Sequence, residues 1–321
     1  MAEKHTFLWH NYLAPKYWPS WLGLAGMRIL VILPYRLQRL IGFSMGQLFY
    51  LLGNYRREVV KTNIALCFPE LSVQEQQQLV KKHFHAIGMG LVEIAMNWWS
   101  PADRLRKLVN IKNYHYVEEA LNQGKGVIIL GAHYTTVEIS ARFITLDNKF
   151  AASYQTMRNP LFDHYTMQAR YRNFDQVFAR DEIRQTFRYI KQNNIVWIAA
   201  DQDTGAENSE FVPFFGQLAA TQTVPSRMAK ITKAAIIPYI SRRLEGNKGY
   251  IMEFFPPLDN FPSGSIKDDI SRTNKILEEL IKQAPEQYLW THRRFKTRPE
   301  GMPKLYRKKP RRAKKQKKIE S

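Results

Sequence analysis

The chain has 321 residues, with 48 Lys and Arg against 28 Asp and Glu, and a net charge of +20 at pH 7. Residues 307–321 contribute +8, so the rest of the chain is also basic, which argues against cationic partners and favours phospholipid head groups, phosphorylated substrates, acidic carrier proteins or nucleic acid. The length allows one large core with a small appendage, and the single Cys67 excludes an internal disulfide and fits a reducing compartment.

The N-terminal part is strongly apolar. Residues 18–34 are apolar except for Ser20 and Arg28, and residues 37–52 continue a mostly apolar pattern that is interrupted by polar residues such as Arg39 and Gln47. A segment of seventeen residues that contains an arginine is marginal as a membrane span, because a bilayer core of about 30 Å needs roughly 20 apolar residues. We predict a membrane anchor region over residues 1–56 that either spans once or lies in the inner leaflet. The alternative is an ordinary buried helical hairpin.

A G-x-S-x-G pattern occurs in this region, as Gly42-Phe-Ser44-Met-Gly46. The nucleophile elbow of hydrolases needs a strand before the serine and a helix after it. Both flanks here are apolar and helical in pattern, so we do not expect Ser44 to be a nucleophile.

Helical patterns dominate up to residue 121. A basic helix from Tyr55 leads to Cys67, and Ser72 with Glu75 forms a capping-box pattern at the start of a long helix that runs to Trp99. One or two further helices are expected over residues 105–121.

From residue 126 onward short apolar strands alternate with helices. Strands are predicted at 127–132, 150–154, 176–179, 195–200, 235–241 and 249–255, and helices at 135–146, 159–172, 181–191, 223–233 and 266–283. Repeated β-α units indicate an α/β fold with a mostly parallel central sheet and helices on both faces. We therefore assign residues 57–306 to one catalytic domain and residues 307–321 to a basic, disordered tail.

The organising stretch is Gly126-Val-Ile-Ile-Leu-Gly-Ala-His133-Tyr-Thr-Thr-Val-Glu138. A buried strand turns into an amphipathic helix at His133. We expect the helix N-terminus to keep this histidine neutral and Glu138 to fix its tautomer, which makes a dyad that activates a hydroxyl group. Asp201 also follows a buried strand, and ligands of parallel sheets lie beyond the carboxyl ends of strands.

The sequence lacks the motifs of several other kinds of chemistry. The spacing does not fit H-E-x-x-H and no Cys/His cluster occurs, which argues against a metal site. Neither G-x-x-x-x-G-K-[ST] nor G-x-G-x-x-G is present, which argues against nucleotide hydrolysis and dinucleotide redox chemistry. We expect no cofactor.

The H-x-x-x-x-E motif at His133, together with Cys67-Phe-Pro-Glu70 and the run Ala284-Pro-Glu-Gln-Tyr-Leu-Trp-Thr-His-Arg-Arg-Phe-Lys-Thr-Arg-Pro-Glu-Gly301, resembles the lysophospholipid acyltransferase superfamily. Within it the chain is most similar to the Gram-negative lipid A late acyltransferases, over roughly residues 10–306. The resemblance implies transfer of a fatty acyl group, lauroyl in the nearest case, from acyl carrier protein to a hydroxyacyl chain of di-Kdo lipid IVA. It also implies the cytoplasmic face of the inner membrane, with phospholipid as a partner.

Residue roles follow from the chemistry and from the resemblance. His133 would be the base and Glu138 its orienter. Arg170 and Asp201 match charged family positions, which implies substrate orientation or an oxyanion pocket, although a structural ion pair remains open. Arg293 and Arg294 could bind substrate phosphates, or belong to a solvated basic segment.

Two other functions remain open from sequence. A glycerophospholipid acyltransferase would share the dyad but not the C-terminal run. A membrane-tethered basic scaffold would bind nucleic acid through its tail, although we expect no specific nucleic-acid partner. The acyl chain length depends on the depth of a pocket that the sequence does not reveal.

Overall fold

The computed structural model describes residues 9–154, 156–179 and 182–307. Its centre is a seven-stranded sheet of order β1-β9-β8-β2-β5-β3-β4, in which only the β8–β9 pair is antiparallel. The strands are β1 (Val109–Lys112), β2 (Val127–Leu130), β3 (Phe150–Tyr154), β4 (Gln176–Ala179), β5 (Ile195–Ile198), β8 (Ala235–Arg243) and β9 (Tyr250–Phe254). The mostly parallel α/β sheet is as predicted.

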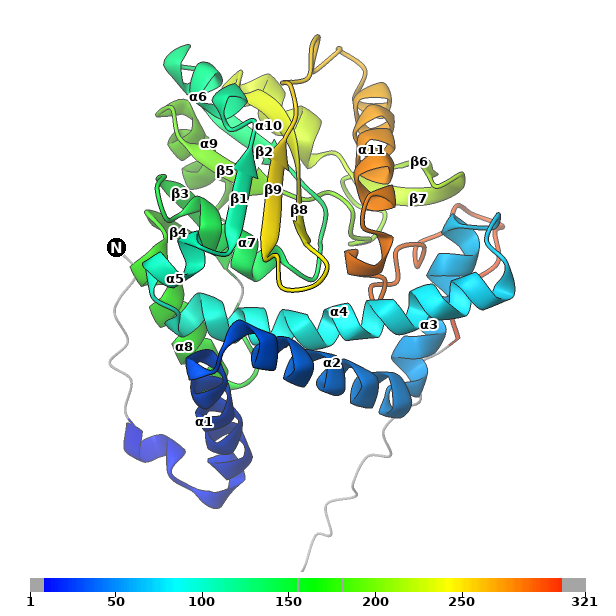
Figure 1. Cartoon of the computed structure of the whole chain (residues 1–321). Helices are drawn as coiled ribbons and strands as arrows, with labels where there is room; N and C mark the ends of the chain where they lie inside the picture. The colour runs from blue at the N-terminus through cyan, green and yellow to red at the C-terminus, as the bar shows by residue number, and fades with distance from the viewer. Residues whose placement is uncertain (1–8, 155, 180–181, 308–321) are drawn as a thin grey trace, which may run out of the picture.

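Helices cover both faces of this sheet (Figure 1). The helices of the N-terminal half are α1 (Trp18–Ile32), α2 (Tyr35–Leu52), α3 (Asn54–Cys67), α4 (Val73–Trp99), α5 (Ala102–Arg106), α6 (His115–Asn122) and α7 (Val137–Ile144). Those that follow are α8 (Pro160–Asn173), α9 (Ile183–Lys191), α10 (Val224–Thr232) and α11 (Ile266–Lys282). Short 3₁₀ helices lie at Trp9–Tyr12, Pro15–Tyr17 and, as η3, at Pro285–Gln287.

Strand β2 is buried on both faces, which explains its unbroken apolar sequence. Ile128 and Leu130 point into a core completed by α9, α10 and α11, whereas Val127 and Ile129 point into a second core completed by α5, α6 and α7. The predicted capping box at the start of α4 is present, since Ser72 and Glu75 exchange their two hydrogen bonds.

Two strand regions were not predicted. Strand β1 falls within the segment expected to be helical, and it is an edge strand whose residues are alternately half-buried and exposed. The hairpin of β6 (Ser209–Phe214) and β7 (Gln217–Gln222) turns at Phe215 and Gly216, both with positive φ. A phenylalanine in the left-handed region gives no turn signal in a sequence, which is why the hairpin escaped prediction.

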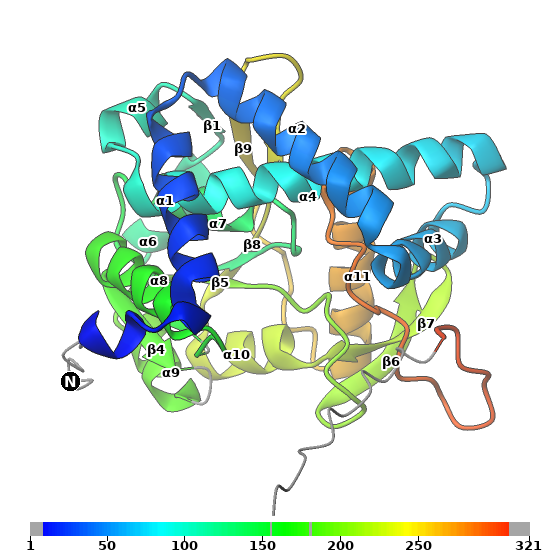
Figure 2. The ribbon, with the colours of Figure 1, turned by 90° about the horizontal axis from the view of Figure 1, so that it is seen from below.

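The long helix α4 runs across the carboxyl ends of the central strands, and α2 packs on its other side (Figures 1 and 2). A Cβ atom at Gly88 would lie 2.0 Å from the Gly42 carbonyl oxygen and 2.4 Å from the Gly46 nitrogen, so the two backbones touch. The glycines of the G-x-S-x-G pattern therefore serve helix packing. Ser44 lies within α2 and donates to the Leu40 carbonyl, so the helical flanks were predicted correctly.

Within the described residues, none of the helices combines the length and the apolarity that crossing a bilayer requires. The predicted disordered tail, apart from Arg307, falls outside the described residues.

Candidate active site

His133 lies just beyond the end of β2, and Asp201 just beyond the end of β5. These strands are adjacent and parallel, with Leu130 paired to Ile198 and the Gly131 amide donating to the Ile198 carbonyl at 3.0 Å. A Cβ atom at Gly131 would lie 2.5 Å from the Tyr239 ring and 2.6 Å from Trp197 Nε1, so only glycine lets the chain leave β2 here. The strand ends thus bring His133 and Asp201 together.

The two residues form a tight double contact. His133 Nδ1 lies 2.6 Å from Asp201 Oδ1, and the His133 backbone amide donates to Asp201 Oδ2 at 2.9 Å. Because the carboxylate only accepts, Nδ1 carries the proton and Nε2 remains unprotonated in the neutral ring. The Asp201 side chain is 1% exposed and the His133 side chain 25% exposed. The pair is buried on the carboxylate side and open on the imidazole side.

The charges of His133 and Asp201 shift the pKa values of both residues. Burial alone would lower the pKa of His133, but the charge and hydrogen bond of Asp201 outweigh it and raise the pKa above the ordinary 6.5. Burial opposes ionisation of Asp201, yet His133 and its amide bring the carboxyl pKa below its ordinary value. A helix N-terminus was expected to lower the pKa of His133, but the neighbouring Asp201 carboxylate dominates and raises it.

Glu138 points to different partners. It lies in the first turn of α7, which begins at Val137, so His133 does lie ahead of the helix as expected. Glu138 Oε1 pairs with Arg170 at 3.2 Å, and Oε2 accepts from Asn97 Nδ2 at 3.2 Å. None of the hydrogen bonds found in the described part of the chain joins Glu138 to His133. Asp201, rather than Glu138, makes the orienting contact with the His133 ring.

Arg170 is held by this carboxylate and by the backbone. Its Nη1 donates to the Ser153 carbonyl at 3.0 Å, and its guanidinium lies 6.0 Å from the Phe174 ring centroid. Its side chain is 17% exposed, and its buried Nε has no hydrogen-bond partner among the described residues. Arg170 and Glu138 thus form a half-buried charged pair on α8 and α7.

Arg293 and Arg294 have opposite environments. Arg294 is 1% exposed, and its terminal nitrogens donate to the Ala220 carbonyl and to Thr221 Oγ1, both at 2.6 Å. Its guanidinium also stacks 4.9 Å from the Phe214 ring. The structure thus places Arg294 in the core, where it holds β7, rather than on a surface that phosphate could reach. Arg293 is half-buried and, within the described residues, has no side-chain hydrogen bond.

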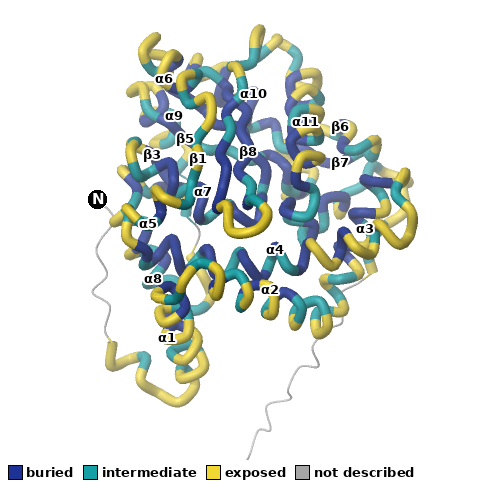
Figure 3. Tube along the Cα trace, in the orientation of Figure 1, coloured by how far each residue is buried: buried dark blue, intermediate teal, exposed yellow. Residues whose placement is uncertain are grey.

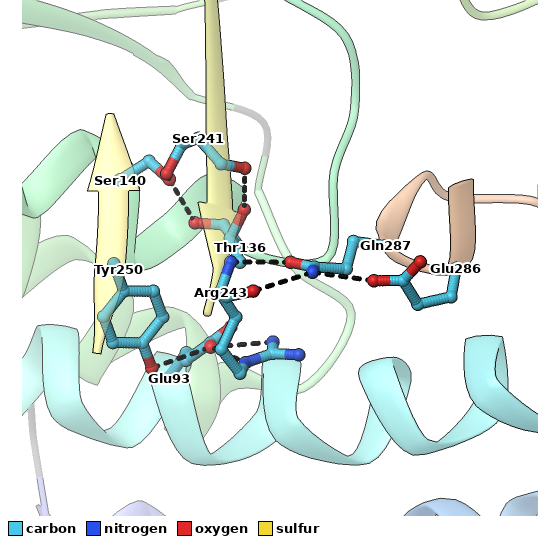
Figure 4. Close-up of polar contacts among 8 residues, drawn as sticks. All are labelled: Glu93, Thr136, Ser140, Ser241, Arg243, Tyr250, Glu286 and Gln287. Carbon is cyan, nitrogen blue, oxygen red and sulfur yellow. Dashed lines mark hydrogen bonds and ion pairs between the residues drawn. The ribbon is translucent and has the colours of Figure 1, made fainter. Parts of the chain in front are cut away.

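A polar network that sequence analysis missed holds the segment after His133 (Figure 4). The Thr135 amide donates to the Gln287 carbonyl at 2.8 Å, and Thr136 Oγ1 donates to the Ser241 carbonyl at 3.0 Å. Gln287 exchanges two hydrogen bonds with the Arg243 backbone. This network fixes the start of α7 between β8 and η3.

A buried ion pair completes this network. Glu93 on α4 is fully buried and receives Arg243 Nε at 2.7 Å and Tyr250 Oη at 2.8 Å on the same oxygen. Burial raises the pKa of Glu93, and the charge of Arg243 and the Tyr250 hydrogen bond only partly oppose this. The pair ties α4 to the sheet beneath the segment that carries His133.

An apolar groove of ≈ 550 Å³ lies next to this segment. Leu289 lines it and donates its amide to the His133 carbonyl at 2.9 Å. The other lining residues come from α2, the α2–α3 junction, α3, α4 and the chain after Leu289: Phe49, Leu52, Gly53, Arg56, Phe84, Ile87, Thr291 and His292. The site therefore combines an imidazole held by a carboxylate, a charged pair and an apolar groove, which suits proton transfer from a lipid hydroxyl. The described residues contain no group of three or more His, Cys, Asp or Glu side chains able to hold a metal.

The family model for the bacterial lipid A biosynthesis acyltransferases matches residues 6–297. The chain belongs to this family. It is 35% identical to the lipid A biosynthesis lauroyltransferase of Escherichia coli (strain K12), over 92% of this chain and 96% of the relative. It is 32% identical to the palmitoleoyltransferase of the same organism over 92% and 97% of the two chains, and 28% identical to its myristoyltransferase over 93% of each.

The resemblance seen in the sequence is thereby confirmed, and this acyltransferase takes part in the biosynthesis of lipid A and so of lipopolysaccharide. The named relatives transfer different acyl groups, so family membership leaves the chain length open. The matched range includes His133, Asp201 and the Glu138–Arg170 pair.

Proposed function

We propose that this acyltransferase moves a lauroyl group from acyl carrier protein to a hydroxyacyl chain of di-Kdo lipid IVA, with His133 as the general base. The single observation that carries the proposal is the His133–Asp201 pair, which leaves Nε2 of a partly exposed imidazole free to accept a proton. The lauroyl group rests on similarity to the lauroyltransferase.

In the proposed reaction His133 Nε2 takes the proton of the acceptor hydroxyl while its oxygen attacks the thioester carbonyl carbon. A new carbon–oxygen bond forms, the carbon–sulfur bond breaks, and the imidazolium returns its proton to the departing thiolate of the carrier. Asp201 stabilises the imidazolium formed between these steps, in agreement with the raised pKa of His133. No covalent acyl-enzyme is needed.

We assign the other predicted residues to substrate orientation. Glu138 fixes Arg170, whose partly exposed guanidinium can face an anionic group of the substrate. Arg293 remains a candidate phosphate ligand because its side chain is half-buried and engaged by no hydrogen bond of the described residues. Arg294 is not assigned to the substrate, because its side chain is buried and its terminal nitrogens bind Ala220 and Thr221 in the core.

We also propose that α1 and α2 lie on the cytoplasmic face of the inner membrane. Both expose many large apolar side chains, among them Leu22 at 74%, Ile32 at 73%, Leu40 at 61% and Leu52 at 72%. Figure 3 shows that exposed positions recur along both helices. Such a surface is unfavourable in water but suits an interfacial helix, and residues 1–56 would then be an embedded anchor.

This placement supports the lipid substrate as well. Phe49 and Leu52 belong to α2 and also line the groove beside His133. An acyl chain could therefore pass from the bilayer into the groove along apolar side chains. The basic surface of the body would attract phospholipid and the acidic carrier protein.

The test offers the full-length enzyme in mixed micelles a pool of acyl carrier thioesters of different chain length, with di-Kdo lipid IVA and, in parallel, a lysophospholipid acceptor. Mass spectrometry should find one added lauroyl group on the lipid A precursor. His133→Ala should reduce the rate at least about 10⁴-fold. The variant should still fold, as circular dichroism would show, but its melting temperature should fall because the buried Asp201 carboxylate loses its ring partner. Ser44→Ala is the control and should remain fully active. Acylation of the lysophospholipid alone, or full turnover by His133→Ala, would refute the proposal.

A further inference from the structure

His292 lies beside the proposed active site but has no part in the chemistry described so far. It follows Trp290 and Thr291 in the segment after η3, and it lines the apolar groove together with Leu289 and Thr291. Leu289 is hydrogen-bonded to the backbone of His133, and the charges of His133 and Asp201 both act on the His292 ring. The ring therefore lies near the place where the acyl group would react.

The tautomer of this histidine is fixed by its surroundings. His292 Nε2 lies 3.0 Å from the backbone nitrogen of Asp203, which can only donate. Nε2 must therefore present its lone pair, and the proton of the neutral ring is on Nδ1. No hydrogen bond of the described residues involves Nδ1, so His292 offers one free N–H donor to whatever occupies the groove.

The ring is also kept uncharged. Burial lowers the pKa of His292 to about 4, and the positive charges of His133 and Arg294 act in the same direction, against the carboxylates of Asp201 and Asp203. Lys296 also lies close by, 3.7 Å from Asp203 Oδ1. At neutral pH the ring is thus a neutral imidazole, which donates a hydrogen bond without readily losing its proton.

We propose that His292 is a further catalytic residue, which donates from Nδ1 to the carbonyl oxygen of the acyl donor. This inference rests on the proposed acyl transfer. When the acceptor oxygen adds to the thioester carbon, the carbonyl electron pair moves to the oxygen, and the oxyanion then collapses with cleavage of the carbon–sulfur bond. A donor already in place stabilises this charge with no reorganisation. His133 and His292 would then divide the work, one as base and one as oxyanion donor.

The competing explanation is structural. His292 Nε2 holds the loop at Asp203, whose carboxylate in turn binds the Thr297 amide at 2.5 Å and the Gly205 amide at 3.0 Å. A residue that only supported this loop would need its Nε2 acceptor and would make no use of Nδ1.

Two substitutions separate these roles. His292→Asn can place an amide N–H where Nδ1 stood but cannot reach Asp203. His292→Gln can place a carbonyl oxygen near the position of Nε2 and keep the Asp203 contact, but it has no donor at Nδ1. Both variants, His292→Ala and the wild type are compared in the full-length enzyme for kcat, KM and melting temperature, with the acyl carrier thioester and di-Kdo lipid IVA as substrates.

We expect His292→Gln to lose about 10²- to 10³-fold in kcat with KM and melting temperature nearly unchanged, the usual cost of one oxyanion donor. His292→Asn should keep most of its kcat while its melting temperature falls. The reverse order, with Gln active and Asn inactive, would assign His292 to loop support and overturn the inference. Equal activity of all variants would also overturn it. If the wild type itself fails to acylate the lipid A precursor, the proposed function fails first, and the two failures are thus distinguishable.

Discussion

Two buried ion pairs flank the segment that follows β2, and they differ in how far their side chains are exposed. His133 and Asp201 lie at the strand ends with 25% of the imidazole exposed, whereas Glu93 and Arg243 lie behind the start of α7 with 0% and 6% of their side chains exposed. Both pairs have strong contacts of 2.6–2.7 Å. The imidazole of the first pair is partly exposed, and its Nε2 makes no hydrogen bond with the residues that the structure describes, whereas both side chains of the second pair are enclosed.

The difference in exposure separates a structural ion pair from one that can take part in a reaction. A buried pair that is closed on all sides stabilises one arrangement of α4 and the sheet, and its charges are compensated only by each other. A pair with one open side can accept a proton from a substrate. Both pairs contain a group with a perturbed pKa, so a shifted pKa does not by itself distinguish a catalytic pair from a structural pair.

The largest expected effect comes from removing the charge at Asp201. Asp201→Asn should lower kcat by about 10³- to 10⁴-fold, because the asparagine no longer fixes the proton on Nδ1 or stabilises the imidazolium. In the wild type, kcat/KM should fall as the pH decreases through the pKa of His133, which lies above its ordinary value. Without the carboxylate, burial lowers this pKa, so in the variant the acid limb should move to lower pH.

Glu138→Gln is the matched control for that variant. It neutralises the other candidate carboxylate, which contacts Arg170 and Asn97 rather than His133. We expect a smaller loss, about 10- to 100-fold, and no shift of the acid limb. A shift in Glu138→Gln together with an unshifted limb in Asp201→Asn would restore Glu138 as the orienter of His133.

Arg243→Met breaks the enclosed ion pair between Glu93 and Arg243. Arg243→Met leaves Glu93 buried without its cation and should reduce the free energy of unfolding by about 3–5 kcal/mol, as measured by urea titration. The double variant Glu93→Leu with Arg243→Met should recover most of this loss. Activity per folded molecule should fall far less than in Asp201→Asn. A double variant no more stable than the single one would show that the pair contributes more than mutual compensation.

The smallest effect concerns the exposed apolar face. Leu40→Gln on α2 removes one large apolar side chain that is 61% exposed, and it should weaken binding to anionic phospholipid vesicles about tenfold, in line with about 1.5 kcal/mol or more per buried leucine. The buried Gln38 nearby belongs to the fold, since its amide donates to the Leu30 and Val31 carbonyls. Vesicle co-sedimentation measures the change, and the kcat in micelles should stay as in the wild type. Unchanged vesicle binding after several such substitutions would mean that this face does not contact lipid.

Local patterns predicted much of this protein. The capping box at Ser72, the strands 150–154 and 176–179, and the strand ends that carry His133 and Asp201 were all readable from the chain. These features depend on residues within a few positions of one another, where backbone geometry and side-chain periodicity act directly. The C-terminal run also identified the family, since it combines many specific residues.

Partners across the fold were decided only by the tertiary structure. The sheet order places β5 next to β2, which delivers Asp201 to His133 across 68 positions, while Glu138, only five positions away, turns toward α4 and α8. Likewise Arg294 is buried against Phe214, although its neighbour Arg293 is not. A sequence pattern specifies where elements end, but which ends become neighbours depends on long-range packing of the whole sheet. That packing places Asp201, rather than Glu138, against His133.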